Sequence, residues 1–217
     1  MNRRFLIVFL LGSASTAFAS QTLPSAMHSQ ETVLFRTFLS PAPDTHSLMY
    51  EVKKGDSLTT IAKAHRVTPD LIKKVNGLLG DKLIPGKKLK IPTYRMSVLV
   101  DKSDNTLTLK GDQEVFKTYV VATGANNSTP VGTFKITNKL TNPTWYKAGA
   151  VVSSGSPKNE LGTRWMGITA KGYGIHGTIE PEKLGQQITA GCIRMKNEEV
   201  EELYSLVGPG TEVTIQD

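Results

Sequence analysis

Hydrophobic and polar residues alternate in short runs through the second half of the chain. The clearest runs are 97–101, 106–109 and 115–121, and the segments between them contain Asp-Asn and Lys-Gly-Asp, which are typical of turns. Two later runs, at 165–169 and 211–216, continue the pattern. A period of two predicts β-strands that bury one face.

One segment of this half has a helical period instead. Residues 198–206 place apolar side chains three and four positions apart, which predicts a short amphipathic helix. Many short strands with one late helix indicate a mainly β domain over residues 95–217, of the β-sandwich or barrel-like type.

Residues 49–92 have two helical stretches between two extended ones. The first helix is expected to begin after Asp56 or Ser57, either of which can cap it, and the second after Thr68, which precedes a proline. A turn and a strand follow at 83–92. The expected unit is a small βααβ domain.

The N-terminal segment has the features of a secretory signal peptide. Arg3 and Arg4 precede an apolar run at 5–11 that is too short to span a bilayer, and small residues at 17 and 19 provide a cleavage site. We therefore expect residues 1–19 to direct export to the periplasm or cell envelope. An uncleaved anchor is the alternative.

Residues 20–48 contain frequent Ser, Thr and Pro, so we expect a linker there. Its one apolar patch, Val33–Leu39, suits a short helix or a segment that docks on a neighbour.

The chain of 217 residues has a net charge of +7, and residues 49–92 contribute ten basic and four acidic residues to it. Nucleic-acid binding is not favoured, because these lysines are not interleaved with stacking aromatic residues and the protein is expected to be exported. A solvated face attracted to an anionic envelope fits better. We expect no metal and no other cofactor, since one Cys and four His lack the spacing of metal ligands.

Cys192 is the only cysteine. In an oxidising compartment it has no internal partner for a disulfide, so a retained thiol is more easily explained by chemistry than by packing. Gly191 permits a sharp turn, Arg194 adds a positive charge that favours thiolate, and His176 lies sixteen positions upstream. The alternative is a small buried apolar residue.

The two segments around these residues resemble the signature of the L,D-transpeptidase (YkuD-type) catalytic domain. They read His-Gly-Thr at 176–178 and Thr-Ala-Gly-Cys-Ile-Arg at 189–194. Many members have His where this chain has Ala190. The resemblance extends over roughly residues 95–217.

The resemblance implies acyl transfer between peptidoglycan stem peptides. Cys192 would attack the carbonyl between the third residue and D-Ala, and His176 would assist the thiolate and protonate the leaving amine. Backbone N–H groups around Gly191 would hold the oxyanion, and the Gly177 carbonyl would orient the histidine. An acceptor amine would then resolve the thioester into a cross-link.

Three further residues are candidates for contact with the substrate. Arg194 suits either binding of a carboxylate or support of the turn, and Thr189 suits either a hydrogen bond at the site or a loop cap. Tyr173 suits a pocket wall or an ordinary strand position. The irregular stretches 142–146 and 153–162 are expected to form a rim over the site.

Residues 49–92 resemble a LysM module, which binds glycans that contain N-acetylglucosamine. The resemblance rests on the Gly-Asp-Ser-Leu segment at 55–58, on Asn76 and on the Pro-Gly turn at 85–86. It places the glycan between the loops 55–59 and 76–80. Candidate ligands are the side chains of Asp56, Ser57 and Asn76, which alternatively only cap and turn the chain.

The expected partners are therefore peptidoglycan stem peptides and glycan strands. Three alternatives stay open. Water instead of an amine would make the protein an L,D-carboxypeptidase, and loss of catalysis would leave a LysM adaptor. The third alternative is a thiol-dependent hydrolase of substrates other than peptidoglycan.

Overall fold

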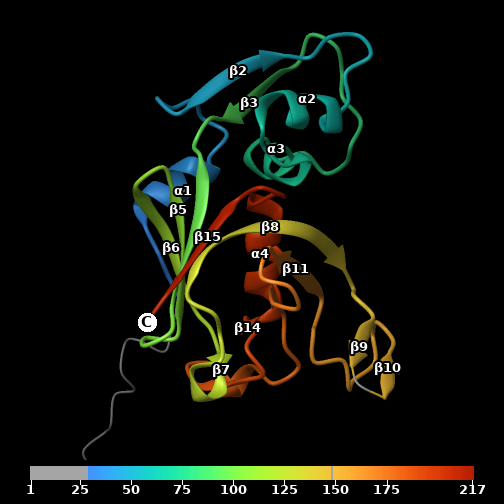
Figure 1. Ribbon diagram of the computed structural model, residues 1–217. Helices are drawn as coiled ribbons and strands as arrows, with labels where there is room; N and C mark the ends of the chain where they lie inside the picture. The colour runs from blue at the N-terminus through green and yellow to red at the C-terminus, as the bar shows by residue number, and fades with distance from the viewer. Residues whose placement is uncertain (1–28, 148) are drawn as a thin grey trace, which may run out of the picture.

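The computed structural model describes residues 29–147 and 149–217 (Figure 1). The expected signal peptide, residues 1–19, lies outside this part of the chain. Within it, no helix is both long and apolar enough to cross a membrane.

A nine-stranded, mostly antiparallel sheet forms the larger domain, as the alternation predicts. Its order is β1-β6-β5-β4-β15-β8-β11-β12-β14, and the pairs β15–β4 and β12–β14 are parallel. The helix α4 (Asn197–Leu206) lies against β11 and β12. The strands are β1 (Gln30–Glu31), β4 (Met96–Asp101), β5 (Thr106–Gly111), β6 (Glu114–Val120), β8 (Gly132–Thr141), β11 (Arg164–Ile168), β12 (Gly174–His176), β14 (Ile193–Arg194) and β15 (Glu212–Gln216).

The core lies between this sheet and α4. Along β5 every second residue is buried, and the helix turns its apolar side chains toward the same interior. Burial of these side chains is the main stabilising term. The expected mainly β fold, with one late helix, is confirmed. The buried residues include Val98, Val100, Leu107, Leu109, Val200, Leu203, Leu206 and Val213.

The smaller domain has the expected βααβ order, with β2 (Ser47–Glu51), α2 (Leu58–His65), α3 (Pro69–Val75) and β3 (Lys88–Pro92). Ser57 caps α2 through a capping box with Thr60, and Thr68 caps α3. The domain has a core of its own, made of Val52, Leu58, Ile61, Ala62, Ile72, Leu89 and Ile91.

The segment expected to be a linker differs from that expectation where the structure describes it. Residues 30–31 form β1, which extends the large sheet, and α1 (Val33–Leu39) follows directly. Phe35 and Phe38 lie one helical turn apart and are both 1% exposed. They pack against Phe116, so the aromatic pair fixes this segment to the sheet.

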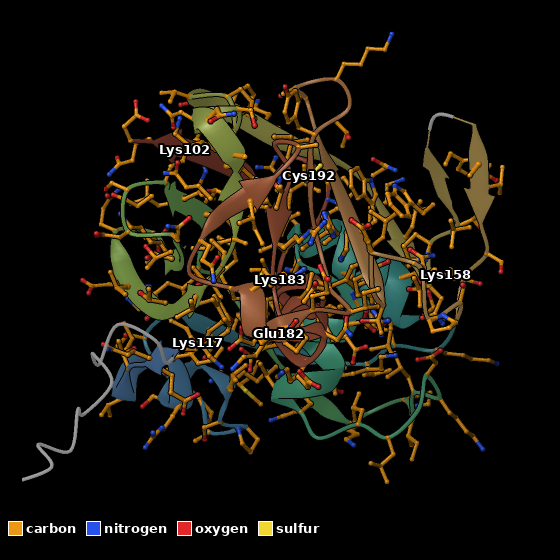
Figure 2. All side chains as sticks on the ribbon, turned by 90° about the horizontal axis from the view of Figure 1, so that it is seen from below. Lys102, Lys117, Lys158, Glu182, Lys183 and Cys192 are labelled. Atoms are coloured by element: carbon orange, nitrogen blue, oxygen red, sulfur yellow. The ribbon has the colours of Figure 1, made fainter. Side chains whose placement is uncertain are left out.

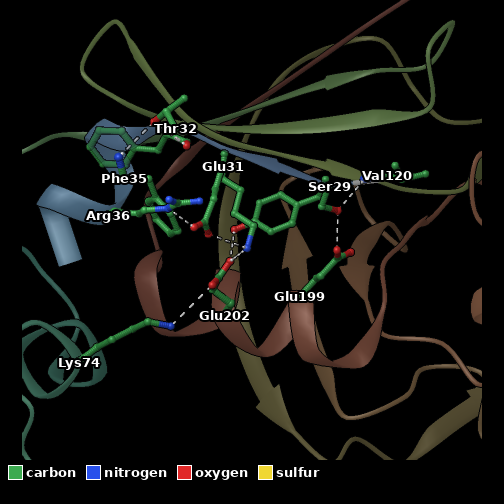
Figure 3. A network of polar contacts seen from close by, with 12 residues as sticks. Ser29, Glu31, Thr32, Phe35, Arg36, Lys74, Val120, Glu199 and Glu202 are labelled. Carbon is green, nitrogen blue, oxygen red and sulfur yellow. Dashed lines mark hydrogen bonds and ion pairs between the residues drawn. The ribbon is translucent and has the colours of Figure 1, made fainter. Parts of the chain in front are cut away.

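The two domains are joined through α3, which contributes side chains to both hydrophobic cores. Leu71 and Val75 of α3 are buried in the core cluster of the large sheet. The Thr68 hydroxyl donates a hydrogen bond to the Ser205 carbonyl at the end of α4. Polar contacts cover the edge of this interface, where Glu202 of α4 pairs with Lys74 of α3 at 3.9 Å (Figure 3).

We predict that Leu71→Ala lowers the free energy of unfolding of the whole chain by roughly 2 to 5 kcal/mol, because it leaves a cavity in the core of the large sheet. Leu79→Ala is the control, since this side chain is fully exposed at 106%, and it should change stability by less than about 0.5 kcal/mol. Urea unfolding monitored by fluorescence and by circular dichroism measures both. Two separate unfolding transitions, one for each domain, in the unmodified protein would contradict the packing of α3 into the core of the large sheet.

Candidate active site

The strand pair β12–β14 places His176 and Cys192 on neighbouring segments of the chain. In this parallel ladder Ile175 is opposite Ile193, and His176 is opposite Arg194. Cys192 immediately precedes β14, and its sulfur lies 3.8 Å from the Gly172 carbonyl oxygen that precedes β12. Cys192 is half-buried and is labelled in Figure 2. In Figure 1, β14, which follows it, lies in the half of the molecule away from the βααβ domain.

His176 is held in one orientation. Its Nδ1 lies 2.7 Å from the Gly177 carbonyl oxygen, as the sequence predicts, and its ring stacks on Trp165 with the centroids 5.8 Å apart. A carbonyl only accepts, so Nδ1 carries the proton of the neutral ring. A Cβ at Gly174 would lie 2.7 Å from the indole, which is why this neighbour has no side chain.

Burial keeps both candidate groups neutral at rest. His176 is 3% exposed, and loss of hydration lowers its pKa to about 4, with a smaller contribution from the charge of Arg194. Burial raises the pKa of the Cys192 thiol, although a Gly174 backbone hydrogen bond and the Arg194 charge lower it. The charge of Arg194 lowers the thiol pKa, as the sequence predicts, but burial has the larger effect and the pKa is raised overall.

The turn before Cys192 is tightly hydrogen-bonded. The Thr189 hydroxyl accepts a bond from the Gly191 N–H at 3.0 Å and donates one to the Cys192 carbonyl at 2.7 Å. Gly191 has a φ of +125°, and a Cβ there would lie 2.4 Å from the ring of Tyr173. The Gly191 N–H is therefore already occupied. In the described part of the chain, the Cys192 N–H donates to no protein group.

Arg194 is paired with carboxylates of the protein itself. Its guanidinium lies 2.5 Å from a Glu160 oxygen and 3.4 Å from a Glu180 oxygen, and only 13% of the side chain is exposed. These contacts tie Arg194 to Glu160 in the expected rim and to Glu180 in the segment after His176.

A cavity of about 300 Å³ opens at the sulfur. One wall includes β9 (Trp145–Lys147), which forms a hairpin with β10 (Ala150–Val152) that projects from the sheet in Figure 1. Buried Asn159 holds this hairpin, because its amide donates to the Pro143 and Ser153 carbonyls at 2.8 and 3.2 Å. The lining residues are Leu140, Pro143, Thr144, Trp145, Tyr146, Leu161, Trp165, Gly172 and Cys192.

The sequence predicts a rim at 142–146 and 153–162, but it indicates only a strand position for Trp165. The indole both lines the cavity and stacks on His176. Its position directly opposite the histidine in the β11–β12 ladder is a long-range contact that the local pattern does not contain.

Family comparisons agree with these features. The model of the L,D-transpeptidase catalytic domain (YkuD) matches residues 95–215, and that of the LysM domain matches residues 50–92. This chain belongs to the YkuD family of L,D-transpeptidases. Both resemblances inferred from the sequence are thereby confirmed.

Individual relatives support the assignment. The L,D-transpeptidase homologue YkuD of Bacillus subtilis is 37% identical over 77% of this chain and 98% of its own length. YqjB of the same organism is 41% identical over 64% of this chain and 77% of its own length. A crystal structure of L,D-transpeptidase 3 from Mycobacterium tuberculosis has a TM-score of 0.50 at 14% identity, covering 79% of this chain and 92% of that one, and shows a shared fold.

The candidate glycan ligands of the LysM domain have partners within the protein. Asp56 accepts hydrogen bonds from the Tyr50 hydroxyl and the Lys53 amide, and Ser57 caps α2. The Asn76 amide joins α3 to β3 through both its oxygen and its nitrogen. These contacts correspond to the alternative that the sequence left open, in which the side chains cap and turn the chain.

No metal-binding group of three or more His, Cys, Asp or Glu side chains occurs in residues 29–147 and 149–217.

The lowered pKa of His176 predicts a pH-dependent stability. Between pH 6.5 and about 4 the unfolded histidine binds a proton and the folded one does not, so stability is full above pH 6.5 and falls as the pH drops. The loss should be roughly 2 to 3 kcal/mol in urea unfolding. His176→Gln should remove most of this slope, whereas His46→Gln, an exposed histidine, serves as the control. An unchanged slope in His176→Gln would refute the buried neutral ring.

Proposed function

We propose that this protein is a cysteine-dependent L,D-transpeptidase that acts on peptidoglycan stem peptides. The observation that carries the proposal is the register of β12 and β14, which sets a buried, neutral imidazole on the strand next to a half-buried thiol that lines a cavity. The family assignment supplies the reaction class. The sulfur attacks the carbonyl between the third residue and D-Ala, and D-Ala leaves as its free amine.

His176 accepts the thiol proton and then donates it to the leaving group. Nε2 of His176 takes the thiol proton as the carbon–sulfur bond forms, and the resulting imidazolium gives it to the departing amine. Burial raises the pKa of the thiol, so the attacking thiolate forms with the substrate in place. The Cys192 N–H is the available backbone donor for the oxyanion, because the Gly191 N–H is bound to Thr189.

The second half-reaction sets the product. A side-chain amine of another stem peptide attacks the thioester, releases the thiolate and forms a cross-link. Water in place of this amine gives a tripeptide and makes the protein an L,D-carboxypeptidase.

The LysM domain, residues 49–92, would anchor the catalytic domain, residues 95–217, to glycan strands. The loops 55–59 and 76–80 offer the binding surface that the family uses, and the second loop presents the fully exposed side chain of Leu79. This arrangement suits a protein exported to the periplasm or cell envelope, with residues 1–19 as its signal.

Tetrapeptide muropeptides analysed by mass spectrometry test the catalytic proposal. The unmodified protein should produce cross-linked dimers, Cys192→Ala should produce none, and His176→Gln should be slower by roughly 10²–10⁴-fold. His46→Gln, the control, should retain full activity. Tripeptides alone would indicate the carboxypeptidase, and an unchanged substrate would favour the non-catalytic adaptor.

Sedimentation with purified sacculi tests the anchoring proposal. Leu79→Ala should weaken binding several-fold, because it removes the exposed apolar contact of the loop. Met49→Ala, an exposed apolar residue on β2 outside both loops, should bind as the unmodified protein does. Equal binding by both variants would exclude this loop as the glycan contact.

A further inference from the structure

Thr129 is a buried polar residue to which the reaction scheme assigns no role. It is 1% exposed, and it lies in the loop between β7 (Thr123–Gly124) and β8, 62 positions before Gly191. Its hydroxyl donates to the Gly191 carbonyl at 2.9 Å and accepts from the Gly124 N–H at 2.7 Å. The side chain therefore bridges two backbone segments, one of which is the turn that carries Cys192.

The three backbone segments are in direct contact. A Cβ on Gly124 would lie 2.6 Å from the Thr129 nitrogen and 2.9 Å from the Gly191 Cα. Such distances leave no room for a side chain or for a water molecule between Gly124 and the turn. In a contact this close, a lost hydrogen bond leaves its partner without solvent as a substitute.

The backbone of Thr129 is held in place by Lys102. The ammonium of Lys102, a side chain that is 2% exposed, donates to the Thr129 carbonyl at 3.1 Å and pairs with Asp217 at 2.9 Å (Figure 2 labels Lys102). The Lys102 carbonyl accepts a hydrogen bond from the Gln187 amide at 3.0 Å, and Gln187 begins the strand that ends at Thr189.

Two threonine side chains thus bind three polar backbone groups of the turn. Thr189 binds the Gly191 N–H and the Cys192 carbonyl, and Thr129 binds the Gly191 carbonyl. Over the described residues, the Cys192 N–H is left without a protein acceptor. The Gly191 carbonyl and the Cys192 N–H belong to one planar peptide group. The hydrogen bond from Thr129 to that carbonyl therefore fixes the direction of the N–H as well.

We propose that Thr129 is a positioning residue, which aims the Cys192 N–H and sulfur at the substrate carbonyl through its hydrogen bond to Gly191. The inference rests on the proposed function, because it presumes that Cys192 is acylated. Its effect is on the transition state, since the oxyanion forms only there.

The test compares Thr129→Val, which keeps the shape and removes the hydroxyl, with Thr129→Ser, which keeps the hydroxyl. Thr133→Val is the matched control at an exposed position on β8. With tetrapeptide muropeptides we expect kcat to fall by roughly 10²-fold in Thr129→Val with little change in KM, as for other misplaced groups. Thr129→Ser should recover most of the loss, and Thr133→Val should match the unmodified protein.

Alkylation of Cys192 by iodoacetamide separates positioning from unfolding. In folded Thr129→Val the small reagent should still label Cys192 at a rate within a few-fold of the unmodified protein, while turnover is lost. Thr129→Val with unchanged kcat, or Thr129→Ser as impaired as Thr129→Val, would overturn the inference.

Amide exchange measured by NMR on the unmodified protein decides the matter if Thr129→Val does not fold or if no turnover is found. The Gly124 and Gly191 amides should exchange slowly and the Cys192 amide fast. A Cys192 amide as protected as that of Gly191 would overturn the inference. Absence of turnover by the unmodified protein would instead count against the proposed function alone.

Discussion

The site depends on the parallel pairing of two very short strands, β12 and β14. Parallel neighbours need a crossover of about a dozen residues or more, and the sixteen positions between His176 and Cys192 satisfy this requirement. His176 ends β12 and Cys192 directly precedes β14, so the pairing of the two strands sets the relative position of residues that are far apart in the chain. The indole of Trp165 then covers Gly174, so the histidine is enclosed by an aromatic face and by the strand itself.

Burial of His176 and Cys192 shifts their protonation equilibria. Desolvation disfavours charge on both groups, so the pair rests as thiol and imidazole rather than as thiolate and imidazolium. A resting neutral thiol is less susceptible to oxidation than a thiolate. Arg194 moderates the effect only partly, because Glu160 and Glu180 neutralise its charge.

The sequence predicted much of the fold because alternation and capping are local signals. The strands at 97–101 and 106–109 and the caps at Ser57 and Thr68 were found in this way. A short helix or docking segment at Val33–Leu39 was predicted, but its place on the large sheet was not, because the burial of Phe35 depends on an aromatic partner 81 positions away. The nucleophile candidate was evident from a single cysteine, whereas its raised pKa reflects burial, which composition does not reveal.

Because α3 contributes to two hydrophobic cores, the small domain does not move independently of the large sheet. A saccharide strand held by the loops of that domain would meet the sulfur at one distance and one angle. To reach a stem further along the same strand, the protein would have to release the strand and bind it again. The spacing between successive cross-links made by one molecule would then be set by the packing of Leu71 and Val75, and not by the length of a flexible linker.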